Sequence, residues 1–389
     1  MSKQIRCMKD YDFENKNVLL RCDFNVPIKN GKVLDEFKIK ATIPTIKYLI
    51  NAGARKIILC SHLGNPSKDE YGNYSLKILL NYLEKMLNVD IAFWDRDLVK
   101  DSMYRDAKII LMENLRFHDG EVENDREFSK KLSDIADVLV IDSFASLHRA
   151  HASIVGIQQN ILSVAGLLVE SELNNLDHIL LDSSPITLVL GGGKPDKIEI
   201  ITSFKDEKVK YILTGGVLAN TFLKHRGFNL GRSKIYDGLF EDVNEIWRKF
   251  EDKILLPEDV VVEDLSKEWK VVDVDKLLED HLIVDLGPKT IRKYSEIIVN
   301  SRANIFGGPL GVIENESYSV GTENILKMLN NSDGRTIVLG GDSNLAVLKF
   351  CPINKFIVST GGGASLFYLS NKILPGLEAL KENYKIYKG

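Results

Sequence analysis

Short apolar runs that end in polar or glycine-rich turns recur along this chain, and they constrain its fold more than any other feature. They occupy residues 18–24, 56–64, 108–117, 138–144, 186–193, 211–216, 304–311, 336–343 and 356–363. Helical patterns lie between them, as in Ile43, Ile46, Leu49 and Ile50, after which Gly53 is expected to form the helix C-cap. Because strands that alternate with helices form βαβ units, the sequence predicts an α/β protein with doubly wound parallel sheets.

The two halves of the chain differ in the residues that follow their strands. The 389 residues are too many for one hydrophobic core, which predicts two domains of roughly 200 residues each. Charged and polar side chains follow the strands before residue 160, whereas glycines follow the strands after residue 185. We therefore expect two domains with different ligands.

The helical pattern of residues 163–181 predicts a helix between the two domains, although a core helix within one domain fits the pattern equally well. The expected boundaries are 1–162 for the first domain, 163–181 for the interdomain helix or hinge, 182–369 for the second domain, and 370–389 for a tail that returns to the first domain.

Composition and charge disfavour several classes of protein. The net charge is −4 and the pI is about 6.1, which argues against a general nucleic-acid binder. The four cysteines are scattered, as expected for reduced thiols in a cytoplasmic protein. The N-terminal segment lacks the apolar core of a signal peptide, and no apolar run is long enough to span a membrane. We therefore expect a cytoplasmic protein without nucleic-acid or membrane partners.

A cluster of basic side chains follows the apolar run Val138 to Ile141. His148, Arg149 and His151 lie within four residues of one another. Open α/β sheets bind ligands at the carboxyl ends of their strands, so cationic donors at this position indicate an anion. A solvated basic turn is the alternative interpretation.

Further polar side chains of the first half could meet the same anion. They are Asp23, Asn25, His62, Arg116, Arg149 and His151. Arginine binds carboxylate and phosphate through a planar fork, so a set with two arginines favours a phosphorylated acid as ligand. Each residue taken alone would more often be a surface or supporting group.

Glycine-rich turns in the second half are typical of phosphate binding. They let backbone N–H groups approach phosphate oxygens, and helix N-termini add a favourable dipole. The segment 359–366 fits this pattern because a helical pattern follows its three glycines. The motif GxxxxGK[ST] is absent, which argues against a P-loop NTPase, and no GxGxxG follows a strand. Tight structural turns remain the alternative.

Charged residues stand directly beside two of these turns. Lys194 and Lys197 follow the triple glycine 191–193 and could neutralise moving phosphate charge, or could simply be exposed lysines that open a helix. Asp342 follows Gly340 and Gly341 and could hold Mg²⁺, or could cap a helix.

Taken together, these segments resemble the phosphoglycerate kinase family over almost the whole chain. The matching segments in the first half are residues 21–27, 61–66, 113–121, 148–153 and 163–173. Those in the second half are residues 190–198, 215–224, 256–262, 285–290, 307–314, 340–343 and 358–366. The resemblance implies a monomer with two doubly wound domains that close about a hinge. It also implies a glycolytic kinase that uses ATP or ADP with Mg²⁺, and direct in-line phosphoryl transfer between 1,3-bisphosphoglycerate and ADP.

The resemblance also implies roles for individual residues. Those that would bind phosphoglycerate are Asp23, Asn25, Lys38, His62, Asn65, Arg116 and Arg149. Those that would bind nucleotide are Lys194, Lys197, Gly307, Glu314, Gly341, Asp342 and Ser343, with Asp342 also as the Mg²⁺ ligand and Glu314 on the ribose. The catalytic set would be Lys38, Lys194, Gly362 and Gly363, with Gly361 as a third glycine amide near the transferring phosphate.

Four departures from the family pattern lie among these residues. Lys38 stands where the family has a catalytic arginine, and Asn65 replaces another arginine. Gly307 replaces an asparagine near the nucleotide, and the loop before Lys197 is one residue short. A working kinase is the leading hypothesis. A related enzyme with an altered acyl-phosphate or carboxylate substrate or reduced activity, and a nucleotide-binding regulator without turnover, remain alternatives.

Overall fold

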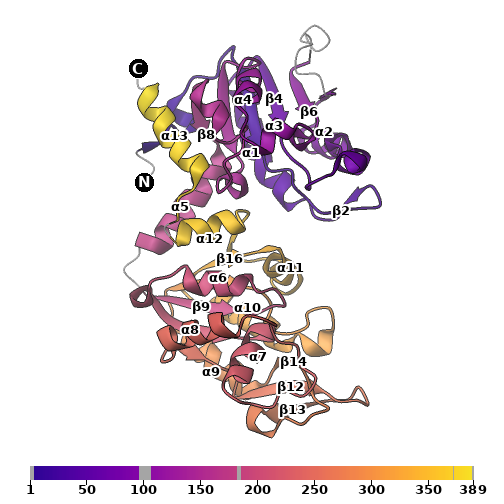
Figure 1. Cartoon of the computed structure of the whole chain (residues 1–389), viewed down its shortest axis with the longest axis vertical. Coiled ribbons are helices and arrows are strands. Elements are labelled where there is room, and N and C mark those ends of the chain that lie inside the picture. The colour runs from indigo at the N-terminus through magenta and orange to yellow at the C-terminus, as the bar shows by residue number, and fades with distance from the viewer. Residues whose placement is uncertain (1–3, 96–106, 182–184, 371, 388–389) are drawn as a thin grey trace. The chain divides into compact units, whose positions relative to one another are not determined.

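Each half of the chain builds its own parallel sheet, as the apolar runs predict. The computed structural model describes residues 4–95, 107–181, 185–370 and 372–387 (Figure 1). It divides into two units, each described here by itself. Unit 1 comprises Met1–Asp177, Gly363–Tyr368 and Lys372–Gly389, and unit 2 comprises His178–Gly362 and Leu369–Asn371. The predicted fold class, α/β with two doubly wound parallel-sheet domains, is confirmed.

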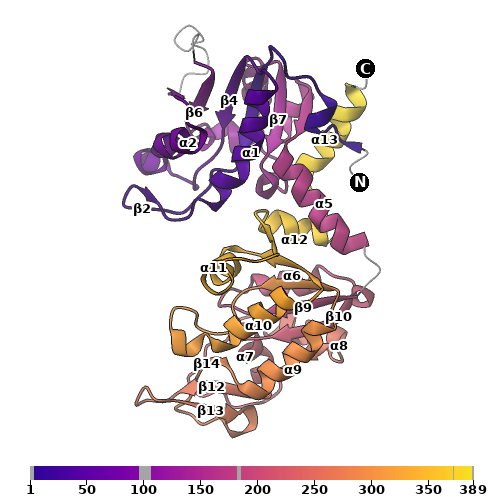
Figure 2. The same cartoon turned by 180° about the vertical axis from the view of Figure 1, so that it is seen from behind.

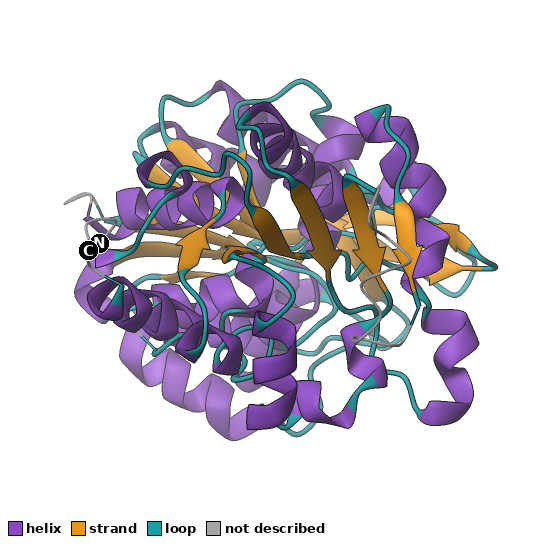
Figure 3. Ribbon diagram, turned by 90° about the horizontal axis from the view of Figure 1, so that it is seen from above, coloured by secondary structure: helices purple, strands orange, loops and turns teal. Residues whose placement is uncertain are grey.

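The sheet of unit 1 has the strand order β5-β6-β4-β1-β7-β8, and every pair is parallel. Its strands are β1 (Asn17–Cys22), β4 (Lys56–Cys60), β5 (Ala92–Trp94), β6 (Ile109–Met112), β7 (Val138–Asp142) and β8 (Ser163–Ala165). Helices lie above and below this row of strands (Figure 3). The helices of unit 1 include α1 (Phe37–Asn51), α2 (Leu80–Leu87), α3 (Asp119–Val122), α4 (Arg126–Ser133) and α13 (Pro375–Ile386), and most of α12 (Gly363–Leu369) also belongs to this unit. The hairpin β2 (Ile28–Lys29) and β3 (Lys32–Val33) follows β1.

The segment 163–181 is not helical throughout, so the prediction of a helix over its whole length is wrong at its start. Ser163–Ala165 forms β8, which pairs with β7, and helix α5 (Leu167–Leu181) begins two residues later. The carboxylate of Asp142 accepts a hydrogen bond from Leu168 N at 2.8 Å and so begins the helix there. The chain passes from unit 1 to unit 2 within α5.

The sheet of unit 2 has the order β11-β10-β9-β15-β16-β17 and is also parallel. Its strands are β9 (Ile186–Leu190), β10 (Val209–Thr214), β11 (Ile254–Leu255), β15 (Ala303–Gly307), β16 (Arg335–Leu339) and β17 (Ile357–Ser359). Helices α7 (Gly216–His225) and α8 (Phe240–Phe250) pack together on one face. Helices α9 (Pro288–Val299) and α10 (Val320–Asn331) pack together on the other (Figure 2). The remaining helices are α6 (Asp196–Thr202) and α11 (Gly341–Phe350).

A small antiparallel sheet of unit 2 was not among the sequence expectations. It has the order β13-β12-β14, with β12 (Asp259–Glu263), β13 (Trp269–Asp273) and β14 (Leu282–Leu286). Val260 and Val262 of β12 pack with Leu223 of α7 in a separate apolar cluster, so this sheet has its own small core.

Helix α13 closes unit 1 at the edge strand β8. Asn383 is buried; its side-chain oxygen accepts from Ser163 N at 2.8 Å, and its amide donates to Gln158 O at 2.6 Å and Ile161 O at 2.8 Å. Gly376 N donates to Leu147 O at 2.9 Å, next to the basic cluster. Among the described residues, no helix has the length and apolar character that a membrane crossing requires.

Candidate active site

The polar side chains predicted to bind phosphoglycerate follow four neighbouring strands of unit 1. Asp23 follows β1, His62 follows β4, Arg116 follows β6, and Arg149 follows β7. Because these strands are parallel, their carboxyl ends meet at one edge of the sheet. The structure therefore gathers side chains from positions up to 126 residues apart (149 − 23) into one basic cluster.

Lys38 lies inside this basic cluster, on the first turn of α1. Its Nζ is 2.8 Å from Oδ2 of Asp23, and the Asp23 side chain is 1% exposed while that of Lys38 is 28% exposed. A carboxylate that is removed from water needs a charged partner, and Lys38 supplies it. The ammonium group has three donors, so two remain available to a ligand.

A buried network supports His62 from beneath. The Arg21 side chain is fully buried; its Nη2 lies 3.0 Å from His62 Nδ1, and its Nε donates to Ser153 Oγ at 2.9 Å. Ser153 Oγ in turn donates to Glu121 Oε1 at 2.6 Å, and Ser153 N donates to Glu121 Oε2 at 3.0 Å. Glu121 is thus a buried counter-charge for the arginine.

The protonation state of His62 follows from this network. Burial lowers the pKa of His62 well below its ordinary value, and the positive charges of Arg21 and Arg116 lower it further. Arginine has no acceptor, so Nδ1 of His62 must accept from Arg21. His62 is therefore neutral and carries its proton on Nε2, where it can donate to a ligand oxygen.

Two further arginines complete the cluster. Burial, followed by the charge of Arg149, lowers the pKa of Arg116 to about 10, which leaves the guanidinium charged near neutral pH. Arg116 Nη1 donates to Gly64 O, and Gly64 N donates to Asn25 Oδ1 at 2.9 Å, so Asn25 and Arg116 hold the same turn. Arg149 Nε donates to His148 Nε2 at 3.2 Å.

Gly363, at the start of α12, also belongs to unit 1 and lies beside the basic cluster. A Cβ atom placed on Gly363 would be 3.9 Å from His148 Nε2. Asn65 follows Gly64 and is exposed, and an asparagine side chain carries no charge that could replace that of an arginine. His151 is half-buried, and burial together with Arg116 and Arg149 lowers its pKa to about 4.

The glycine turns of unit 2 meet at the carboxyl edge of the second sheet. Gly191 follows β9, and its N–H donates to Gly307 O, the last residue of β15, at 3.0 Å. Ser343 is buried and links the next turn, because its Oγ accepts from Gly308 N at 2.7 Å and donates to Leu339 O at 2.6 Å. The hydroxyl of Ser343 is therefore engaged within the protein.

Lys194 and Asp342 meet at the same edge. Lys194 Nζ is 2.8 Å from Asp342 Oδ2, and the two side chains are 66% and 47% exposed. The hydrogen bond to Asp342 raises the pKa of Lys194. Gly340, with φ of +92°, allows the chain to turn sharply before α11, so that Asp342 lies in the first turn of this helix. The ammonium group of Lys194 and the carboxylate of Asp342 are thus adjacent.

Lys197 has a different environment from Lys194. It is buried, and its Nζ is 2.5 Å from Asp196 Oδ1. Its stem lies over the turn of Gly307 and Gly308, since Cβ atoms placed on these glycines would be 3.8 Å from Cδ and 2.9 Å from Cε of Lys197. The lack of a side chain at position 308 therefore leaves room for this lysine, whereas a Cβ at position 307 would only touch it at an ordinary van der Waals distance.

The remaining predicted residues lie in α11, after β17 and after β15. Gly341 is the first residue of α11, and Gly361 and Gly362 follow β17 in unit 2. Glu314 is exposed in the segment after β15. Within residues 4–95, 107–181, 185–370 and 372–387, no cluster of three or more His, Cys, Asp or Glu side chains is placed to hold a metal ion.

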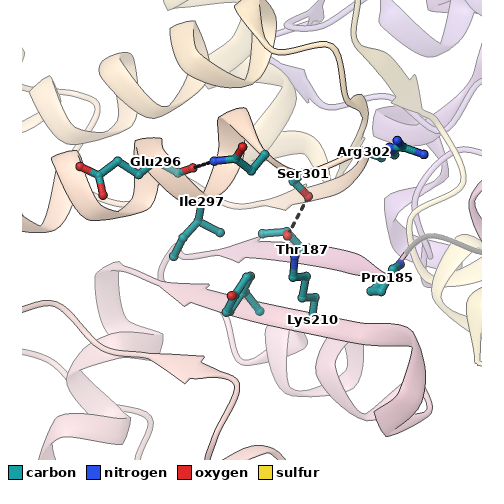
Figure 4. Close-up of a pocket in the computed structure, with 9 residues that line it drawn as sticks. Pro185, Thr187, Lys210, Glu296, Ile297, Ser301 and Arg302 are labelled. Atoms are coloured by element: carbon teal, nitrogen blue, oxygen red, sulfur yellow. Dashed lines mark hydrogen bonds between the residues drawn. The ribbon is translucent and has the colours of Figure 1, made fainter.

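One cavity of unit 2 lies away from all of these residues. Its volume is about 430 Å³, and it opens between Pro185 and Thr187 at the start of β9 and Ser301 and Arg302 before β15 (Figure 4). Ser301 Oγ donates to Thr187 Oγ1 at 2.8 Å. The glycine turns follow the carboxyl ends of β9 and β15, so this cavity at their amino ends contains none of the predicted site residues.

Sequence reasoning missed the residues beneath the basic cluster. Arg21, Glu121 and Ser153 were not among the predicted site residues. One signal could have identified Arg21, because it is the only charge in the apolar run 18–22. A charge in a buried strand must be paired, which indicates a partner network but not its members.

Comparisons with known proteins agree with this architecture. The family model described as Phosphoglycerate kinase matches residues 8–372. Relatives named Phosphoglycerate kinase include one from Finegoldia magna, 42% identical over 97% of this chain and 99% of its own, and one from Borreliella afzelii, 39% identical over 97% and 100%. A solved structure of phosphoglycerate kinase from Coxiella burnetii is 34% identical, with a TM-score of 0.86 over 97% of this chain and 99% of its own. That from Pyrococcus horikoshii is 30% identical, with a TM-score of 0.86 over 98% and 100%.

These similarities place the chain among the phosphotransferases, enzymes that move a phosphoryl group between two substrates. Within that class it belongs to the phosphoglycerate kinase family, a family of glycolytic kinases. The predicted family and enzyme class are confirmed, and the comparisons give no support to an enzyme of altered substrate.

Proposed function

We propose that this chain catalyses reversible phosphoryl transfer between 1,3-bisphosphoglycerate and ADP, which gives 3-phosphoglycerate and ATP. The observation that carries the proposal is the basic cluster of unit 1. Arg21, Arg116 and Arg149 gather there with Lys38, while the buried carboxylates Asp23 and Glu121 offset only part of their charge. A small, highly charged acid is the ligand that such a surplus of donors favours.

In this proposal the carboxylate and phosphate of the acid share the donors of the basic cluster. The proposed substrate-binding residues are Asp23, Asn25, Lys38, His62, Asn65, Arg116 and Arg149. Neutral His62 donates through Nε2, and Asp23 orients the ammonium group of Lys38. Arg116 and Arg149 supply planar forks that match the geometry of carboxylate and phosphate.

The nucleotide takes the glycine turns of unit 2. The proposed nucleotide-binding residues are Lys194, Lys197, Gly307, Glu314, Gly341, Asp342 and Ser343. Lys194 pairs with phosphate oxygens, and the backbone N–H groups at the start of α11 face the phosphate chain. Glu314 is exposed and can accept hydrogen bonds from ribose hydroxyls.

The proposed mechanism is positioning with charge neutralisation and needs no covalent intermediate. The catalytic residues are Lys38, Lys194, Gly362 and Gly363. Lys38 and Lys194 neutralise charge on the transferring phosphoryl group, while the amides of Gly362 and Gly363 donate to its oxygens. Transfer between ligands held by different units requires that the two ligands approach each other as the units close and exclude water.

We also propose Asp342 as the protein ligand of Mg²⁺. Its exposed carboxylate in the first turn of α11 fits an ion that takes one or two carboxylates and completes its shell with phosphate oxygens and water. The ion, when bound with the nucleotide, would shield the phosphate charges from the attacking oxygen. Lys194 must share or leave Asp342 Oδ2 when the ion is present.

We further propose a cytoplasmic monomer with small-molecule substrates and no nucleic-acid or membrane partner. All four cysteines are free and buried, which suits a reducing compartment. Size-exclusion chromatography with light scattering would measure the molar mass, and a mass twice that of the chain would show that the monomer proposal is wrong.

A coupled assay tests the proposed function. Purified protein is given 3-phosphoglycerate, ATP and Mg²⁺, and the 1,3-bisphosphoglycerate formed is reduced by an excess of a dehydrogenase. Turnover that disappears when any one of the three components is omitted supports the proposal. No turnover with 3-phosphoglycerate, from protein that is folded and binds nucleotide, would overturn it.

A further inference from the structure

Tyr236 lies beneath the loop that carries Lys194. It belongs to the segment between α7 and α8, and its side chain is 7% exposed. Its hydroxyl donates to Lys194 O at 2.6 Å and lies 3.2 Å from Gly192 O. One buried phenol therefore binds the backbone of the glycine loop on both sides of Gly193.

The backbone of Tyr236 is itself fixed to α7. Tyr236 N donates to Thr221 Oγ1 at 3.0 Å, and Asn220 Nδ2 donates to Lys234 O at 3.0 Å. Thr221 and Asn220 are both buried. Side-chain bonds from a packed helix hold the segment, so the phenol has a rigid support.

The loop above Tyr236 has little packing of its own. Gly193, Lys194 and Pro195 are exposed, and a Cβ placed on Gly193 would meet no atom within 4 Å. Gly192 has a φ of +86°, a conformation that glycine adopts readily but that does not itself restrict the chain. The conformation of this loop must therefore be fixed by hydrogen bonds rather than by side-chain packing.

We propose that Tyr236 is a positioning residue that holds the backbone of Lys194, so that the ammonium group stands beside Asp342 and the nucleotide phosphates. The inference rests on the proposed function, because it assigns a purpose to this placement. Lys194 Nζ stands 2.8 Å from Asp342 Oδ2 while its own carbonyl is held by the phenol. A mobile loop loses conformational entropy when the nucleotide binds, which weakens binding, whereas a loop that is already fixed does not.

The hydroxyl, rather than the ring, carries this role. Burial raises the pKa of Tyr236 far above neutral pH, so the hydroxyl keeps its proton and remains a donor. Phenylalanine retains the ring and its packing and removes only this donor. Tyr236→Phe is therefore the informative variant.

Tyr294 provides a matched control in the same unit. It is fully buried, and its hydroxyl donates to Leu255 O at 2.7 Å and lies 3.0 Å from Thr214 O. Tyr294→Phe thus removes a buried phenol hydroxyl from two backbone carbonyls, but not from the loop of Lys194. Both variants should lose stability, Tyr294→Phe more because its hydroxyl also accepts from Thr214 N at 3.3 Å, whereas only Tyr236→Phe should disturb the loop.

Steady-state kinetics is the first test. We expect Tyr236→Phe to raise the KM for the Mg-nucleotide about tenfold, the effect of one lost hydrogen bond together with renewed loop disorder. The KM for 3-phosphoglycerate should stay within about twofold, and Tyr294→Phe should leave both constants at the wild-type values. Equal nucleotide KM values in the wild type and in Tyr236→Phe would overturn the inference.

Hydrogen exchange of the free protein is the second test, and it does not depend on activity. A peptide that spans residues 191–196 should exchange faster in Tyr236→Phe than in the wild type or in Tyr294→Phe. Unchanged exchange there would show that the phenol does not hold the loop. An inactive wild type with this exchange difference would instead refute the proposed function and leave the contact itself in place.

Discussion

Replacement of Lys38 tests the catalytic role proposed for the basic cluster of unit 1. The family resemblance predicts an arginine at the position of Lys38, and Lys38 pairs with Asp23 at 2.8 Å. Lysine has three donors on a flexible stem, and one of them is committed to Asp23. Arginine has five donors in a fixed plane, so it could keep the bond to Asp23 and present a rigid pair to the transferring phosphoryl group.

The size of the effect follows from these contacts. One additional charged hydrogen bond in the transition state is worth roughly 1.5–3 kcal/mol, or one to two powers of ten in rate. Lys38→Arg should therefore raise kcat about tenfold or more. Lys38→Met removes the charge, leaves Asp23 buried without its cation, and should lower kcat at least 100-fold.

The assay is the coupled reaction at saturating 3-phosphoglycerate and Mg-ATP, with melting temperatures measured in parallel. Lys40→Met is the matched control. Lys40 lies on the same helix, is 64% exposed, and pairs with Glu36 at 3.0 Å rather than with the cluster. Its removal should leave kcat unchanged and cost at most about 1 kcal/mol of stability.

Three results would contradict this reasoning. If Lys38→Met retained the wild-type kcat, Lys38 would not be the catalytic cation. If Lys40→Met lost activity while Lys38→Met did not, the neighbouring lysine would have taken over the role. A Lys38→Arg variant that is folded but slower would show that the cluster has adapted to lysine.

Three other experiments test the roles of residues and ligands in the two units. Asp342→Ala should lower turnover at least 100-fold and weaken Mg-ADP binding in calorimetry, and an unchanged affinity would remove Asp342 from the site. Small-angle scattering should give the smallest radius of gyration only with phosphoglycerate and nucleotide together, whereas equal radii with and without both ligands would contradict closure. Burial raises the pKa of Asp142 from 3.8 to about 7, so the folded carboxyl keeps a proton between these values while the unfolded one is ionised. The stability of the wild type relative to Asp142→Asn should therefore fall as pH rises from about 4 to 7 and level off above 7, and a difference that does not vary with pH in urea titrations would contradict this.

Local sequence patterns predicted most of the strands, but not which segments pair or contact one another. The apolar runs marked nine of the twelve described strands of the two parallel sheets, because a strand buried on both faces shows as a continuous apolar run, and they missed the short strands β5, β8 and β11. The same reasoning placed Ser163–Ala165 in a helix, since three small residues fit either structure and only the pairing with β7 decides between them. The antiparallel strand β13 was missed because its side chains are largely exposed.

The candidate site shows the same division. Motifs identified Asp23, His62 and Arg149 because polar residues at strand ends stand out against apolar runs. The network of Arg21 and Ser153 joins positions 132 residues apart, and no local spacing encodes such a contact. The role of Tyr236 could not be predicted for the same reason, because its hydroxyl donates to Lys194 O, which lies 42 residues away in the sequence.

The position of α13 has a consequence for how the chain is made. Unit 1 contains the beginning of the chain, yet its edge is sealed by residues 375–386, through Asn383 on β8 and Gly376 on Leu147. Domains usually fold as units, the first one during synthesis. Here the edge of the first unit is not covered until residues 375–386 have left the ribosome. A nascent chain that stops short of Pro375 therefore lacks the hydrogen bonds that Gly376 and Asn383 form with Leu147 and Ser163 of unit 1.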